Sequence, residues 1–230
     1  MSQEARSEAL IEVLDELTAA DIGFVLVGGY AISQFETRFS TDLDLVIAPD
    51  DYESIVVFLE ERNFERTAEF EVPPEDTIYN REIELYERSE GLPHPVGVDI
   101  LVNGLGCRQT DAEWSFDYLR DHSTETTITG GTRSTTAPTA NGEILVAAKL
   151  HSGRKTDLAD VLAAVPSIDL DTVESHLHRG DPEALQAQLN DAQTFIEEGG
   201  LDHRFKSVFG KSAASSEDVE VLLEFLEDQQ

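Results

Sequence analysis

Two aspartates inside an apolar strand constrain this chain more than any other feature. The segment DLDLVI (residues 42–47) is apolar apart from its two acids. Side chains alternate between the two faces of a strand, so Asp42 and Asp44 share one face while the leucines share the other. Two ionised carboxylates on one face repel each other unless a cation lies between them. The pattern therefore indicates a site for a hard metal ion that prefers oxygen ligands.

A second apolar segment, FVLV (residues 24–27), precedes this strand and ends at Gly28-Gly29. Its β-branched residues and short length predict a buried strand, followed by a short helix over residues 30–36. The glycine pair has two interpretations. It forms a tight turn that needs a positive φ, or it lets a phosphate approach main-chain N–H groups at the start of the helix.

In this order, the glycine pair and the RFSTDLD segment (residues 38–44) resemble the nucleotidyltransferase superfamily with the DNA polymerase beta-like fold. The likeness is closest to small prokaryotic members that include the AbiEii-type toxins of toxin–antitoxin systems. It is clearest over residues 20–105 and does not extend beyond residue 165. It implies that Gly28, Gly29, Arg38 and Thr41 bind the nucleotide. Alternatively, Arg38 forms a local ion pair, and Ser40 and Thr41 fix the start of the strand by hydrogen bonding.

A third acid interrupts the apolar segment VGVDILV (residues 96–102) at Asp99. An acid in the middle of such an apolar run does not suit a merely solvated role, and burying its charge without a partner would be costly. The resemblance implies that Asp99 joins Asp42 and Asp44 as a catalytic, metal-binding residue. The alternative is that Asp99 satisfies a loop or pairs with an arginine.

The chain turns helical after residue 141, where EILVAAKLH (residues 143–151) is followed by SGRKTDLADV. This part is similar to a lysine- and aspartate-containing segment of AbiEii-type proteins, which implies that Lys149 and Arg154 face the nucleotide phosphates. The alternative for Lys149 is a snorkelling side chain on an apolar helix. We expect an α/β (α+β) architecture: a mixed sheet flanked by helices over residues 1–140, which is the nucleotidyltransferase-like catalytic domain, and a helical C-terminal domain over residues 141–230.

Periodicity elsewhere predicts an amphipathic helix over residues 2–20 and a hairpin over residues 124–138, closed at Gly130-Gly131. Residues 64–72 and 76–88 are expected to be strands, with the glutamates of the second strand facing water. Residues 109–123 form a polar segment with Trp114, Phe116, Tyr118 and Leu119 as anchors, and residues 206–216 are expected to be a loop.

The charge is unusual, because 47 acidic residues against 16 basic ones give a formal net charge of −31. Concentrated salt would screen this repulsion, so we expect a halophilic, salt-adapted protein. The single cysteine excludes an internal disulfide. No apolar run is long enough to span a bilayer and no signal peptide opens the sequence, so we expect a cytoplasmic protein with no membrane partner.

Taken together, the resemblance implies an Mg²⁺-dependent nucleotidyltransferase that uses two metal ions and an NTP. Its acceptor would be an RNA or protein hydroxyl, and an antitoxin protein would be a possible partner. Two alternatives stay open. The chain is a catalytically inactive nucleotide-binding module on the same fold, or it is a protein-interaction module whose acids reflect salt adaptation alone.

Overall fold

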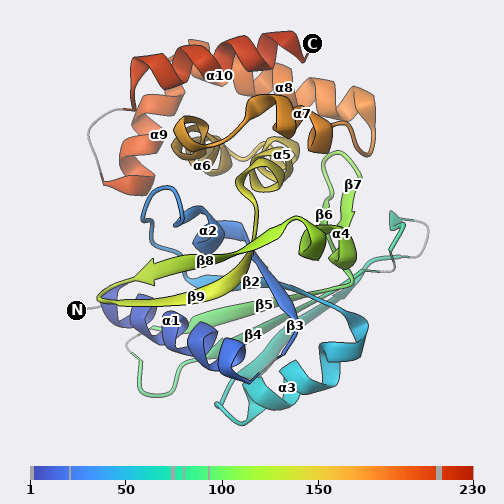
Figure 1. Ribbon diagram of the computed structural model, residues 1–230, viewed down its shortest axis with the longest axis vertical. Coiled ribbons are helices and arrows are strands. Elements are labelled where there is room, and N and C mark those ends of the chain that lie inside the picture. The colour runs from blue at the N-terminus through green and yellow to red at the C-terminus, as the bar shows by residue number, and fades with distance from the viewer. Residues whose placement is uncertain are drawn as a thin grey trace. The chain divides into compact units, whose positions relative to one another are not determined.

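The computed structural model describes residues 3–20, 22–73, 76–79, 81–92, 94–210 and 214–229. The chain folds into two compact units. The first comprises residues 1–105 and 114–140, and the second comprises residues 106–113 and 141–230. The α/β class with a mixed sheet flanked by helices is confirmed (Figure 1).

A seven-stranded sheet in the order β3-β4-β5-β2-β1-β9-β8 forms the first unit. The central strand β2 pairs antiparallel with β1 and parallel with β5, and β1 in turn pairs parallel with β9. The strands are β1 (Phe24–Val27), β2 (Asp42–Ile47), β3 (Glu65–Glu71), β4 (Glu82–Arg88), β5 (Val96–Val102), β8 (Ser123–Gly130) and β9 (Arg133–Ala140).

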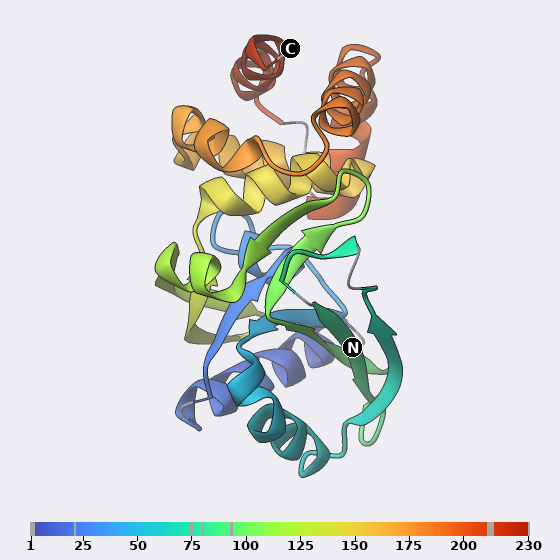
Figure 2. The same ribbon diagram turned by 90° about the vertical axis from the view of Figure 1, so that its right-hand side faces the viewer.

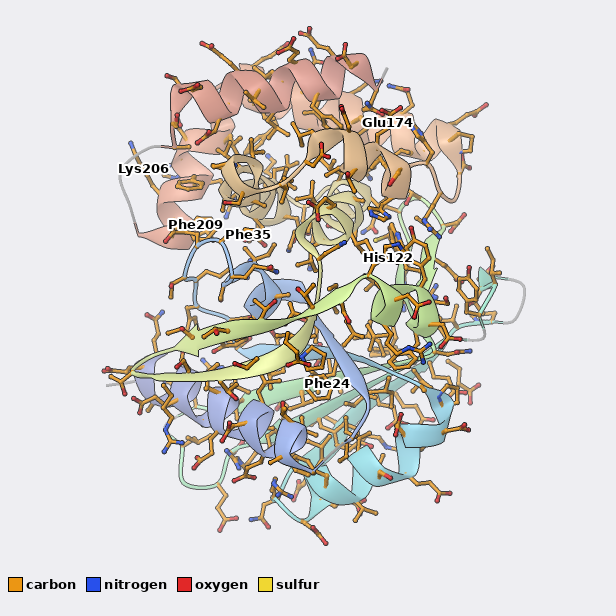
Figure 3. The ribbon with its side chains drawn as sticks, in the orientation of Figure 1. Phe24, Phe35, His122, Glu174, Lys206 and Phe209 are labelled. Atoms are coloured by element: carbon orange, nitrogen blue, oxygen red, sulfur yellow. The ribbon has the colours of Figure 1, made fainter. Side chains whose placement is uncertain are left out.

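The core of the sheet lies in β1, β2 and β5, and all four residues of β1 are buried (Phe24 is labelled in Figure 3). On β2 the leucines at 43 and 45 are buried, whereas Asp42 and Asp44 between them are partly exposed. The alternation expected from the sequence is therefore present. One face of β2 packs into the apolar interior and the other presents its acids.

Short helices connect the strands of this unit, and α1 packs along β8 and β9 (Figure 1). The apolar stripe expected for the first helix is buried, including Leu10, Leu14 and Leu17. The hairpin β8–β9 turns at the expected glycines. The helices are α1 (Gln3–Ala19), α2 (Gly28–Ile32), α3 (Tyr52–Glu60, after the 3-10 turn η1, Pro49–Asp51) and α4 (Phe116–Asp121).

Helices make up most of the second unit (Figure 2). Helix α5 packs against α6, α7 and α8, and α9 packs against α6. No helix in the described part of the chain is both long and apolar enough to cross a membrane. The helices are α5 (Gly142–Ser152), α6 (Lys155–Ala164), the 3-10 turn η3 (Val165–Ser167), α7 (Leu170–Leu177), α8 (Pro182–Glu197), α9 (Gly200–Phe209) and α10 (Ser216–Asp228).

Two segments for which the sequence predicts no helix or strand are in fact ordered. The two-stranded sheet β6 (Gly104–Cys107) and β7 (Ala112–Ser115) leads into α4, and Ser115 caps that helix by accepting a hydrogen bond from the Tyr118 N–H. Helix α9 covers the start of the expected 206–216 loop, of which residues 211–213 lie outside the described residues. Leu201, Phe205 and Phe209 on α9 recur at helical spacing and are buried, whereas β6 and β7 are too short to carry a periodic pattern.

Glu84 was expected to face water and is instead buried in the sheet. The hydroxyls of Tyr52 and Tyr86 each donate a hydrogen bond to its carboxylate at 2.6 Å, and Arg66 binds it at 2.9 Å. Burial raises the pKa of the Glu84 carboxyl, but these three donors outweigh that effect and leave it lowered. The prediction was wrong because α3 and β3, which supply two of the donors, come from outside the strand.

Candidate active site

Asp42, Asp44 and Asp99 lie on one face of the sheet, on the adjacent strands β2 and β5. The two strands run parallel in a register that places Asp44 directly beside Asp99 and Asp42 beside Gly97. Residues aligned across a sheet point to the same side, and Asp42 and Asp44 are two positions apart on one strand. The sheet therefore brings together the three acids that the sequence singled out.

Gly28 closes one side of this group of acids. It follows β1, whose last residue pairs with Asp44, and it has a φ of +67°. A Cβ atom at Gly28 would lie 1.8 Å from the Asp44 Oδ2 atom. Any other residue at this position would therefore collide with the carboxylate as well as strain the backbone. The glycines form the first two positions of α2, rather than a separate turn before a helix at residues 30–36.

Arg38 and Ser40 lie close to Gly29, the second residue of α2. A Cβ atom at Gly29 would lie 2.8 Å from the Ser40 Oγ atom and 3.1 Å from the Arg38 Nη2 atom. The absent side chain thus leaves room for a cation and a hydroxyl beside the start of the helix.

Two hydroxyls hold the Asp42 carboxylate in place. Ser40 donates to its Oδ1 atom at 2.9 Å and Thr41 donates to its Oδ2 atom at 3.3 Å. Ser40 is buried and Thr41 is exposed. Both hydroxyls make the kind of hydrogen bond expected of residues that fix the start of the strand, and Ser40 makes the shorter one.

The electrostatic environment of Asp99 is shaped by burial and by its acidic neighbours. Burial, and after it the charges of Asp44, Asp42 and Glu87, together raise the pKa of the Asp99 carboxyl from 3.8 to about 7. An acid in this position shares its surroundings with other negative charges that only a cation or a proton can offset.

The donor set fits a magnesium ion. Carboxylate oxygens are the ligands that Mg²⁺ prefers, and here they come from two neighbouring strands. Within the described ranges, no three acidic, histidine or cysteine side chains already lie close enough together to hold a metal ion. To bind a cation, these side chains would therefore have to turn toward it. Without a cation, the repulsion between the carboxylates keeps them apart.

A pocket of about 190 Å³ opens at these acids. Asp42 and Asp99 line it, together with Thr41, Gly97 and two residues that sequence reasoning missed, Arg6 and Glu87. Arg6 belongs to the amphipathic helix α1 and Glu87 to a strand expected to face water. Periodicity identifies both elements but does not show that they meet at the acids.

Lys149 and Arg154 lie in the second unit, where acidic side chains bind them. The Lys149 Nζ atom lies 2.9 Å from Asp157 and 2.6 Å from Asp160, and all three side chains are buried. The Arg154 Nε atom lies 2.5 Å from Asp157. Burial raises the pKa of the Asp157 carboxyl, but Lys149, Arg154 and Ser152 together outweigh it and lower that pKa. These contacts account for both cations within one unit.

We expect Asp99→Asn to stabilise the metal-free protein at pH 8. The folded-state pKa of Asp99 is about 7, whereas an aspartate in an unfolded chain titrates near 4. Between roughly pH 4 and 7 the folded state binds more protons, so the contribution of Asp99 to stability falls as pH rises through this window. Thermal unfolding in chelator and constant salt should show a gain of several degrees at pH 8, since 1 kcal/mol shifts Tm by about 2–4 °C.

The same substitution should give no comparable gain near pH 4, where the carboxyl is protonated in the folded protein. Asp50→Asn serves as the control, because Asp50 is exposed and its loss removes one charge from the same acidic chain. An equal gain at both pH values would show that Asp99 is not held in an unfavourable environment.

Comparison with known proteins gives a fold. No protein family and no curated protein sequence matches the chain. Among solved structures, a Helicobacter pylori protein described as a candidate nucleotidyltransferase is similar over 100% of this chain and 95% of its own, with a TM-score of 0.52 and 15% identity. JHP933 from Helicobacter pylori is similar over 100% of this chain and 92% of its own, with a TM-score of 0.53 and 15% identity.

The nucleotidyltransferase toxin MenT4 from Mycobacterium tuberculosis H37Rv aligns over 97% of this chain and 83% of its own. Its TM-score of 0.42 and identity of 16% are too low to support an argument. The Helicobacter pylori structure described as a candidate nucleotidyltransferase, together with the mixed seven-stranded sheet, confirms the nucleotidyltransferase-type fold that the resemblance implies. The AbiEii-type likeness stays a prediction.

Proposed function

We propose that this chain is an Mg²⁺-dependent nucleotidyltransferase, which moves a nucleotide from an NTP to an acceptor hydroxyl. The observation that carries the proposal is the register of β2 and β5, which sets Asp44 beside Asp99 with Asp42 on the same face. The sheet thereby presents three carboxylates beside Gly28. Gly28 can lie this close to Asp44 only because it has no side chain. The fold shared with the Helicobacter pylori protein described as a candidate nucleotidyltransferase supports the same class of activity.

In this proposal Asp42, Asp44 and Asp99 hold two Mg²⁺ ions. Bound there, Mg²⁺ would neutralise phosphate charge and stabilise the attacking and leaving oxygens of an in-line displacement. The acceptor oxygen forms a bond to the α-phosphorus, the bond from that phosphorus to the bridging oxygen breaks, and pyrophosphate leaves. Asp99 either completes the metal site or accepts the proton of the acceptor hydroxyl.

Gly28, Gly29, Arg38 and Thr41 would bind the triphosphate. The glycines expose main-chain N–H groups at the start of α2, and Arg38 lies beside Gly29. The proposal leaves out Lys149 and Arg154, because Asp157 and Asp160 already bind them within the second unit. An RNA or protein hydroxyl as acceptor, and an antitoxin as partner, rest on the AbiEii-type resemblance alone.

Radiolabelled NTPs test the proposal directly. Each of the four NTPs is incubated with the protein, Mg²⁺ and either total RNA or total protein, and mass spectrometry identifies the labelled acceptor. The assay is run from low to molar salt, because a chain of net charge −31 is expected to need screening. Transfer of label that chelator abolishes supports the proposal. NTP binding without transfer would instead indicate the catalytically inactive module, and neither binding nor transfer would favour a protein-interaction module.

A further inference from the structure

Arg6 is a basic residue that lies at the group of acids. The nucleotidyl-transfer mechanism proposed above gives it no role. It lines the pocket of about 190 Å³ together with Asp42, Glu87 and Asp99. The chain holds only 16 lysines and arginines among 230 residues. A guanidinium is therefore an uncommon group in this chain, and here it lines a pocket whose other charged residues are acidic.

Arg6 lies against an aromatic ring, and one of its guanidinium N–H groups forms no hydrogen bond with the described residues. Its Cζ atom lies 5.5 Å from the centre of the Phe39 ring, a distance at which the ring attracts the cation. Its Nε atom is buried and has no hydrogen-bond partner among the described residues. A buried donor without a partner is costly, so an acceptor that arrives at this atom would be bound favourably.

Arg6 also belongs to the same electrostatic neighbourhood as Arg38. Burial and the charge of Asp42 raise the pKa of the Tyr30 hydroxyl, and the charges of both cations act to lower it. This hydroxyl also forms a hydrogen bond with the side chain of Ser7, which follows Arg6 in α1. Tyr30 is buried in α2, directly after the glycine pair. The first turns of α1 are thereby tied to the part of the site at which the phosphates are proposed to bind.

We infer that Arg6 binds the phosphate groups of the nucleotide, as a second cation beside Arg38. The inference rests on the proposed function for the identity of the anion. An arginine fork suits phosphate oxygens, because its N–H groups can form charge-assisted hydrogen bonds with them. A triphosphate that enters with Mg²⁺ would supply the acceptor that the Nε atom lacks. Arg6 is thus a substrate-binding residue, contributed by a helix that sequence reasoning treats only as a cover for the sheet.

The test measures the binding of inorganic tripolyphosphate at saturating Mg²⁺ by titration calorimetry. We expect Arg6→Gln to weaken binding about tenfold or more, since a hydrogen bond to a charged group contributes at least a factor of this order. Arg6→Lys keeps the charge but loses the fork, so it should fall between Arg6→Gln and the unaltered protein.

Arg120→Gln is the matched control. The Arg120 Cζ atom lies 5.6 Å from the Phe116 ring centre, almost the same arrangement as at Arg6, but Arg120 does not line the pocket. Its loss should leave tripolyphosphate binding unchanged. Thermal unfolding of each variant separates weakened binding from weakened folding, and Arg6→Lys carries the test if Arg6→Gln does not fold.

Four outcomes separate the inference from the proposed function. Tripolyphosphate affinity within twofold of the unaltered protein in Arg6→Gln would overturn the inference, and a change confined to Mg²⁺ affinity would show that Arg6 only offsets the acids. Failure of the unaltered protein to bind tripolyphosphate would also overturn it. Binding that depends on Arg6, in a protein that transfers no nucleotide from any NTP, would support the inference while removing the proposed function.

Discussion

Asp44→Asn is expected to lower nucleotide transfer about a thousandfold or more. Asp44 lies between Asp99 on β5 and the Gly28 backbone, at the centre of the group of acids. Asparagine has nearly the same shape but no charge, so the fold should survive while the metal ligand is lost. Metal ions contribute several kcal/mol of charge stabilisation in the transition state, and each 1.36 kcal/mol is worth about tenfold in rate. The measurement is the initial rate of label transfer to the identified acceptor.

The control for this prediction is Asp50→Asn, which removes an equal charge just beyond the end of β2. Asp50 is exposed in the 3-10 turn η1, away from the register that aligns the three acids. It should transfer nucleotide at the rate of the unaltered protein. If Asp44→Asn transfers as fast as Asp50→Asn does, then the acids of β2 do not hold the reactive metal and the mechanism is wrong.

Lys149→Met should destabilise the second unit by about 3–5 kcal/mol, the usual cost of removing one partner from a buried ion pair. The Lys149 ammonium lies within 2.9 Å of Asp157 and 2.6 Å of Asp160, and Asp160 has no exposed surface. Methionine keeps the apolar stem but leaves both carboxylates without this cation. Chemical denaturation, followed through the helical signal, measures the change.

Lys155→Met is the matched control, because Lys155 is also in the second unit but is exposed. Its Nζ atom lies 4.8 Å from the centre of the Phe195 ring, a contact worth about 0.5–1 kcal/mol at an exposed site. A Lys149→Met variant as stable as Lys155→Met, but with weakened NTP binding, would favour the alternative that Lys149 faces the nucleotide.

The sequence allowed part of the site to be predicted, and the reason differs from residue to residue. Alternation alone placed Asp42 and Asp44 on one face of a strand, and the structure has them there. That Asp99 lies beside Asp44 depends on which strands pair, a long-range property that periodicity does not contain. The expectation for Asp99 came from the resemblance. Arg6 was missed because a basic residue on an amphipathic helix gives no sign of what it faces.

The fold shows the same division between local and long-range information. Strands and helices with a strong apolar pattern, such as β1 and α1, lie where they were expected. The short strands β6 and β7 were missed, because a run such as GLGC carries too little pattern to distinguish it from a turn. Glu84 was misjudged because the tyrosine and arginine that bind it come from other elements.

The path of the chain through β6 and β7 has a consequence for protein engineering. Residues 106–113 leave the first unit and return to it, so no single cut separates the two. In the second unit the Thr110 hydroxyl lies 2.7 Å from the His151 ring, and the Cys107 thiol lies 3.3 Å from the Ala148 carbonyl oxygen. A truncation after residue 140 would remove the partners of residues 106–113. A fragment that begins at residue 141 would in turn lack residues 106–113, which belong to the second unit. Recombination between relatives would have to exchange two separate segments together.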